Sequence, residues 1–174
     1  MQFEVWSKGL AELEVDCIVA GVFDEPELAG EARTLDAAAG GRLKALLARG
    51  DFSGRNAETL LLTDVPGLKS ERVLLVGLGS RKSFGRKPWR RACTAALNAL
   101  ARTRIASAAF AIERPGVKEL DDYYFGRALA ELAGSALYRI NDLKSGKKPA
   151  PPTLERIVAG PVRGAGIAQA RRGL

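Results

Sequence analysis

Short apolar runs that alternate with helical patterns constrain this chain more than any other feature. The clearest runs are Cys17–Val22, Val73–Gly77 and Ser107–Ile112. Such a run is typical of a strand that is buried on both faces, in a sheet with helices on each side. The alternation therefore predicts an α/β domain with a central sheet flanked by helices.

Amphipathic patterns predict three helices. Apolar residues recur at helical spacing within Leu35–Arg49, from Trp89 to Leu100 and from Phe125 to Leu137. Gly50 is placed to end the first helix, and Pro88 suits the first turn of the second.

Further strands are expected around Phe3 and Val5, at Thr59–Thr63 and at Leu154–Val158. The segment Val65-Pro66-Gly67 reads as a turn that is too short for a parallel crossover. We therefore expect a mixed sheet, in which the strands on either side of this turn are antiparallel neighbours.

The chain has 174 residues, the size of one ordinary domain. We assign residues 1–160 to the α/β domain, including a basic, proline-rich connector at 144–153. Residues 164–174 read as the opening of an amphipathic helix. We expect 161–174 to begin a linker to a further, C-terminal domain.

Composition excludes several function classes. The chain has no histidine, which removes His-based acid–base catalysis, Ser-His-Asp and Cys-His nucleophiles and the commonest metal ligand. Cys17 and Cys93 lie within apolar patterns, so buried thiols are expected instead of a disulfide. No apolar run approaches the roughly 18 residues of a membrane span, and the N-terminus alternates like a strand. We expect a soluble, cytoplasmic protein with no membrane contact.

Positive charge is concentrated after the first 40 residues. That segment holds nine acidic and two basic side chains, so it carries −7 and leaves +14 on the remainder of a chain whose net charge is +7. Six cations follow one another without an intervening acid: Arg81, Lys82, Arg86, Lys87, Arg90 and Arg91. This basic run predicts either contact with a nucleic-acid backbone or a solvated helix face.

A glycine-rich segment, Gly77, Gly79 and Ser80, follows the apolar run that begins at Val73. Backbone amides in such a place can cradle phosphate. The dinucleotide and P-loop fingerprints both fail because Lys82 stands where each needs glycine. A plain turn at the strand end is the alternative interpretation.

Acidic residues Glu119, Asp121 and Asp122 precede the third helix. They are either metal ligands or charges placed favourably at a helix start, and the second interpretation is favoured. The neighbouring Tyr123 and Tyr124 predict no specific ligand.

Four segments stand in a distinctive order and spacing along nearly the whole chain: Arg49–Gly54, Glu71–Gly79, Leu137–Ser145 and Gly166–Leu174. A strand followed by Gly-Leu-Gly is common by itself. Taken together, the four segments resemble the N-terminal domain of leucyl aminopeptidases, the cytosol aminopeptidase family.

The resemblance implies a macro-domain-like fold joined by a long helix to a C-terminal catalytic domain. That domain would hold two divalent metal ions, manganese or zinc, and all catalytic residues of a cytoplasmic homo-hexamer that releases N-terminal amino acids from peptides. No residue from Met1 to Leu174 inherits a catalytic or metal-binding role, so we expect this chain alone to be catalytically silent.

Two other functions stay open. Some bacterial relatives in the resembled family bind DNA, which suggests a nucleic-acid-binding module built on residues 81–91. The macro-like fold and the Gly77–Ser80 segment suggest a domain that binds an ADP-ribose-type ligand.

Overall fold

A computed structural model describes residues 1–6, 9–114, 116, 121–142, 153–160 and 172–173. Six strands form one sheet: β1 (Gln2–Val5), β2 (Cys17–Phe23), β3 (Thr59–Thr63), β4 (Arg72–Gly79), β5 (Ser107–Ala111) and β6 (Arg156–Ala159). Its helices are α1 (Gly30–Ala38), α2 (Arg42–Arg49), α3 (Arg86–Leu100) and α4 (Asp122–Asp142), with short 3-10 turns η1 (Leu10–Glu12) and η2 (Arg81–Ser83).

The sheet is mixed, as expected. Its strand order is β1-β6-β5-β2-β4-β3. Strand β3 pairs antiparallel with β4, while the other neighbours run parallel. The short turn at Val65-Pro66-Gly67 thus joins antiparallel neighbours.

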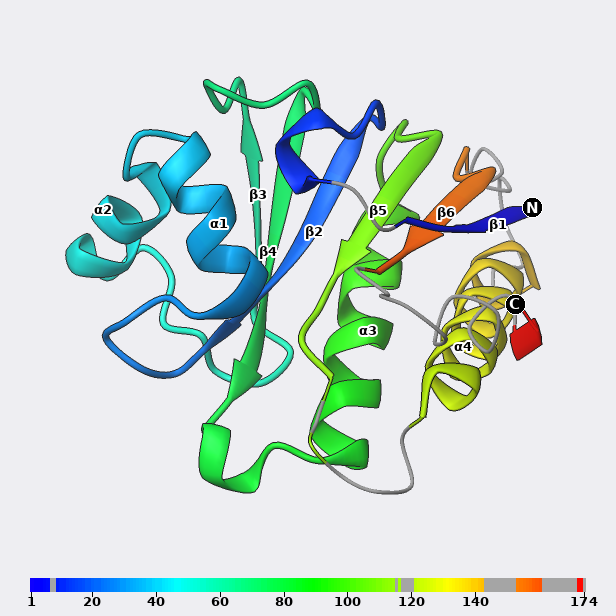
Figure 1. Ribbon diagram of the computed structural model, residues 1–174. Coiled ribbons are helices and arrows are strands. Elements are labelled where there is room, and N and C mark those ends of the chain that lie inside the picture. The colour runs from blue at the N-terminus through cyan, green and yellow to red at the C-terminus, as the bar shows by residue number, and fades with distance from the viewer. Residues whose placement is uncertain (7–8, 115, 117–120, 143–152, 161–171, 174) are drawn as a thin grey trace.

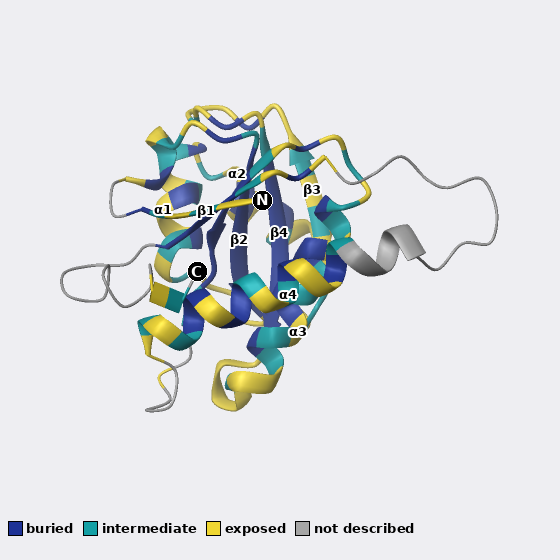
Figure 2. Ribbon diagram, turned by 90° about the vertical axis from the view of Figure 1, so that its right-hand side faces the viewer, coloured by how far each residue is buried: buried dark blue, intermediate teal, exposed yellow. Residues whose placement is uncertain are grey.

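Helices cover both faces of the sheet, which makes three layers (Figure 1). Helices α3 and α4 pack on one face, and α1 and α2 cover the other. Every residue of β2 is buried, and β4 is buried from Val73 to Leu78. Figure 2 shows both strands at the centre of the molecule. The prediction of strands buried on both faces is confirmed.

The predicted single helix over Leu35–Arg49 is wrong. Two helices occupy this region, α1 and α2, and the break lies at Gly40 and Gly41. Both glycines adopt positive φ, 64° and 82°, which a continuous helix does not allow. Gly50 ends α2 with φ 79°, as predicted.

The predicted strand at Thr59–Thr63 has its predicted bounds as β3, and the other predicted elements of the described residues are present with shifted bounds. Helix α3 begins two residues before Pro88, and β6 begins two residues after Leu154. Residues 144–152 of the connector predicted at 144–153 lie outside the described residues, as do 161–171 and 174 of the linker predicted at 161–174.

Both cysteines are buried free thiols, as predicted. Burial raises the pKa of Cys17 to about 12 and also raises the pKa of Cys93. Among the described residues, no helix is long and apolar enough to cross a membrane.

Candidate functional site

The topological switch point of the sheet lies between β2 and β5. The chain leaves β2 toward β4 but leaves β5 toward β6, on the opposite side. Ligands of open α/β sheets bind beyond the carboxyl ends of the strands at such a point. A ligand-binding site is therefore expected at this end of the sheet.

An arginine bridges the switch point. Arg81, just after β4, forms ion pairs with Glu25 at 3.3 Å and with Glu113 at 3.0 Å. Its guanidinium also lies 4.0 Å from the centre of the Phe23 ring. Burial lowers the pKa of Arg81, but the two carboxylates outweigh this effect and raise it. These four residues, here called the Arg81 cluster, compensate the arginine charge, leave a net charge of −1 and tie together the segments that follow three strands.

The glycine-rich segment is strand, not loop. Gly77 and Gly79 belong to β4, and the segment that enters β3 packs across them. The Gly77 amide donates to the Glu58 carbonyl at 2.8 Å, and the Gly79 amide donates to the Gly54 carbonyl at 2.9 Å. The suggested phosphate-binding segment therefore has no free backbone donor at its two glycines.

Close backbone approach explains the glycines of this region. A Cβ at Gly77 would collide with the Arg55 carbonyl oxygen, and one at Gly54 would collide with the Phe23 carbonyl. Asn56 completes the junction, because its side-chain amide donates to the Pro88 carbonyl at 2.9 Å and to the Leu78 carbonyl at 3.3 Å. Two of the segments that carry the family resemblance, Arg49–Gly54 and Glu71–Gly79, thus contain glycines that close backbone packing requires.

The six cations of the basic run do not form one surface. Arg81 is bound within the Arg81 cluster, while Arg86 and Arg90 contact Tyr124 of α4. Lys82, Lys87 and Arg91 are exposed, and no ion pair involves them in the described part of the chain. Among the described residues, these three have neither an ion pair nor the Tyr124 contact, so they are free solvated cations.

A groove of about 380 Å³ lies between α3 and α4. We call it the arginine groove, and it is lined by Arg86, Arg90, Tyr123, Tyr124, Arg127, Ala128 and Glu131. Arg86 Nε donates to the Tyr124 hydroxyl at 2.7 Å, and Arg90 Nη1 lies 3.5 Å from the same oxygen. Arg127 pairs with Glu131 at 2.8 Å. Hydrogen bonds with Glu131 and then Tyr123 raise the pKa of Arg127.

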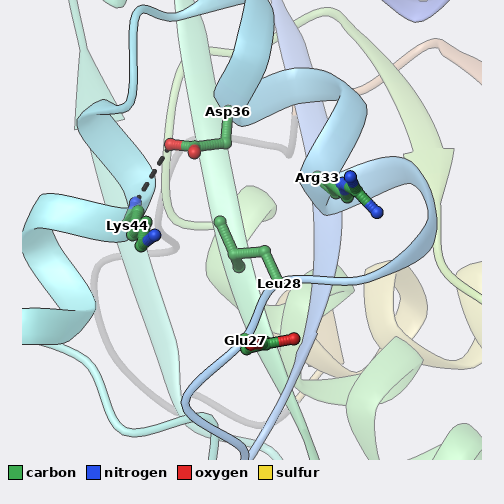
Figure 3. Close-up of a pocket in the computed structure, with 5 residues that line it drawn as sticks. All are labelled: Glu27, Leu28, Arg33, Asp36 and Lys44. Carbon is green, nitrogen blue, oxygen red and sulfur yellow. Dashed lines mark hydrogen bonds between the residues drawn. The ribbon is translucent and has the colours of Figure 1, made fainter.

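A second hollow, of about 310 Å³, lies beside α1 and α2 (Figure 3). Two acids, Glu27 and Asp36, and two bases, Arg33 and Lys44, line it with Leu28. The Asp36 carboxylate points to α2 and accepts the Lys44 amide hydrogen at 3.0 Å, so it caps that helix. Balanced charge and a capping contact give this hollow a structural explanation.

The acidic residues before α4 act at the helix start. Asp121 accepts the Tyr124 amide hydrogen at 2.8 Å, and Asp122 forms an ion pair with Arg114. Glu119 lies outside the described residues. Within the described ranges, no three His, Cys, Asp or Glu side chains gather as metal ligands. These residues do not fit a two-metal centre.

The sequence pattern did not predict the ion-pair and hydrogen-bond partners that determine which cations of the basic run are compensated. Arg81 lies 56 residues from Glu25 and 32 from Glu113, and Arg86 lies 38 residues from Tyr124. No local pattern marks such pairs. A glutamate two residues after the end of each of two buried strands was a usable signal, because parallel strands end at the same edge.

Comparison with known proteins gives a consistent result. The family model described as "Cytosol aminopeptidase family, N-terminal domain" matches residues 19–147. A "Probable cytosol aminopeptidase" of Burkholderia orbicola is 36% identical over 157 residues, which cover 88% of this chain and 31% of that protein. The chain thus spans about a third of the length of this curated relative.

Two solved structures show the same fold. A tomato leucine aminopeptidase variant has a TM-score of 0.69 at 19% identity, over 99% of this chain and 34% of that one. A Trypanosoma brucei macrodomain in complex with ADP also has a TM-score of 0.69, at 14% identity, over 99% of this chain and 68% of that one. At these identities the likeness concerns the fold alone, and it is macro-domain-like, as expected.

Proposed function

Because the chain belongs to the cytosol aminopeptidase family as its N-terminal domain, we propose that it serves an aminopeptidase as a non-catalytic domain. The match over residues 19–147 carries this proposal. The whole enzyme would release N-terminal amino acids from peptides in the cytoplasm, as a homo-hexamer. Its catalytic residues and two divalent metal ions, manganese or zinc, would lie in a C-terminal domain.

The chemistry of the described residues supports a non-catalytic role. A two-metal hydrolase needs convergent carboxylates to hold its ions and activate water. Here Glu25 and Glu113 neutralise Arg81, Glu131 neutralises Arg127 and Asp121 caps α4. We propose that residues 1–160 form the domain, with 144–153 as connector and 161–174 as the start of a linker helix.

Association with a catalytic domain tests this role. The chain is co-expressed with the remaining two thirds of the Burkholderia orbicola relative, and co-purification and hydrolysis of leucine p-nitroanilide are measured. We expect the two parts to co-elute and to exceed the activity of the catalytic part alone. The Trypanosoma brucei macrodomain is the matched control, because it shares the fold at 14% identity. Equal activity with either partner would contradict the proposal.

Nucleic-acid binding is a second candidate. Lys82, Lys87 and Arg91 support it, because they are exposed and form no ion pair with a described residue, and phosphate backbones attract such side chains. Fluorescence anisotropy with a labelled duplex, titrated at several salt concentrations, tests it. Reversal of these three residues to glutamate is expected to abolish binding, and affinity that survives the reversal would contradict this candidate. An ADP-ribose-type ligand has less support, because the Arg81 cluster occupies the switch point.

A further inference from the structure

The arginine groove carries positive charge that the described structure leaves uncompensated. Arg86 and Arg90 stand one turn apart on α3, and neither forms an ion pair with a described residue. Arg127 enters from α4 and is paired with Glu131. Three guanidinium groups and one carboxylate leave a net charge of +2 on the lining. Like charges four residues apart on a helix are unfavourable, so this pair does not serve helix stability.

Tyr124 holds the two α3 arginines in place. Its hydroxyl oxygen accepts the Arg86 Nε hydrogen at 2.7 Å, and the Arg86 guanidinium lies 4.8 Å from the centre of its ring. The Tyr124 backbone is fixed in turn by the Asp121 side chain. Because that oxygen acts as an acceptor, the hydroxyl hydrogen is available to an anion in the groove. Among the described residues, the guanidinium groups of Arg86 and Arg90 have no hydrogen-bond partner other than this hydroxyl, so their remaining hydrogens are available as well.

From this geometry we propose that the arginine groove binds the phosphate group of a small phosphomonoester. A phosphate monoester carries a charge of about −1.5 to −2 at pH 7, which matches the +2 of the lining. Guanidinium groups bind phosphate oxygens through paired hydrogen bonds. The groove volume of about 380 Å³ holds a phosphate with a small organic group. A phosphodiester or a carboxylate carries one negative charge and leaves one cation unmatched.

The arginine Nε–Hε signals in NMR spectra of the ¹⁵N-labelled chain test the site directly. The probes are inorganic phosphate, phosphoserine, dimethyl phosphate and acetate, each titrated at constant ionic strength and at about pH 7.5, above the second phosphate pKa. We expect phosphate and phosphoserine to shift the signals of Arg86, Arg90 and Arg127. The signals of Arg33 and Arg104 serve as internal references and should not move. Dimethyl phosphate and acetate are expected to bind at least tenfold more weakly.

Two double variants distinguish binding in the arginine groove from a general effect of positive charge on phosphate affinity. Arg86→Gln with Arg90→Gln is expected to weaken phosphate binding at least tenfold. Lys87→Gln with Arg91→Gln removes the same charge from the same helix outside the groove, and it should change affinity less than twofold. Equal weakening by both pairs would overturn the proposal. So would equal binding of dimethyl phosphate or an absence of shifts in the unaltered chain, a result that does not depend on the variants folding.

Discussion

The Arg81 cluster and the arginine groove use the same residue type within one basic run, yet they are built in opposite ways. Arg81 has two carboxylate partners and lies over the Phe23 ring, so its charge is compensated by residues of the same chain. Arg86 and Arg90 have one shared hydroxyl and no carboxylate among the described residues. A row of cations in a sequence is therefore not one surface, because acids from other strands decide which charges remain available.

The two regions also differ in how tightly the backbone is packed. Beside the Arg81 cluster, Gly54 and Gly77 lie directly against neighbouring carbonyl groups, and Asn56 ties β4 to α3. The arginine groove lies between two helices, and its hydrogen bonds and ion pair join side chains. Substitutions near the first region should change stability, while substitutions in the groove should leave it nearly unchanged.

The largest effect is expected for Gly77→Ala. Its Cβ would collide with the Arg55 carbonyl oxygen, which belongs to backbone and cannot swing away. We expect a loss of about 3 kcal/mol in the free energy of unfolding, measured by urea denaturation. Gly134→Ala is the matched control, because this exposed site in α4 has open space and should gain about 0.5–1 kcal/mol. Similar small changes at both positions would show that the packing at β4 is looser than described.

The second largest loss of stability is expected for Asn56→Ala. The substitution leaves the Leu78 and Pro88 carbonyl groups without their side-chain donor, which costs about 1–3 kcal/mol. Thermal and urea unfolding measure the loss. Asn98→Ala, on the exposed face of α3, is the control and should stay within about 0.5 kcal/mol. An equal loss of stability in the two variants would contradict the role of Asn56 in joining β4 to α3.

Arg81→Gln is expected to cost about 0.5–1 kcal/mol, since its ion pairs are partly exposed. Arg86→Gln with Arg90→Gln removes two charges that no carboxylate of a described residue pairs, and it should stay within about 0.5 kcal/mol. Unfolding is measured at low and high salt, and only the Arg81 effect should shrink as salt screens the ion pairs. The reverse ranking would contradict the comparison between the two regions.

The smallest expected effect is the pH-dependent contribution of Glu58 to stability. Burial raises the pKa of Glu58, but hydrogen bonds from Ser53 and Arg55 outweigh burial and lower it below the usual 4.5. A carboxyl group whose pKa is lowered by folding stabilises the fold above the unfolded pKa and loses that contribution as the pH falls through the folded pKa. Glu58→Gln should therefore cost about 0.5 kcal/mol at pH 7. The difference from the unaltered chain should shrink as the pH falls below 4.5 and through the lowered pKa of Glu58.

The unaltered chain, followed over the same pH series, is the control for this prediction. A Glu58→Gln difference that stays constant with pH would mean that the hydrogen bonds around this carboxylate do not favour its charged form.

Local patterns predicted the buried strands, the antiparallel turn and helix α3, because each depends on residues near one another in the chain. The break between α1 and α2 was also marked locally, by Gly40-Gly41, but the apolar stripe from Ala39 to Leu47 favoured a continuous helix. Two adjacent glycines with positive φ outweigh such a stripe, since no helix continues through them.

The candidate sites were harder to predict because their partners are distant in sequence. Gly77 and Gly79 suggested a phosphate loop, and only the packing of residues 54–58 across β4 shows where their amides donate. Likewise, the basic run gave no hint that Glu25 and Glu113 neutralise Arg81 or that Tyr124 holds Arg86. Strand order determines these contacts, and it is not a local property.

Peptidase activity of the purified chain tests the central claim most directly. Hydrolysis of leucine p-nitroanilide is measured with added Mn²⁺ or Zn²⁺, beside the full-length Burkholderia orbicola relative as positive control. A non-catalytic N-terminal domain predicts no turnover above the metal-only blank at any concentration of the chain. Turnover that rises in proportion to the chain and disappears with a chelator would contradict this account.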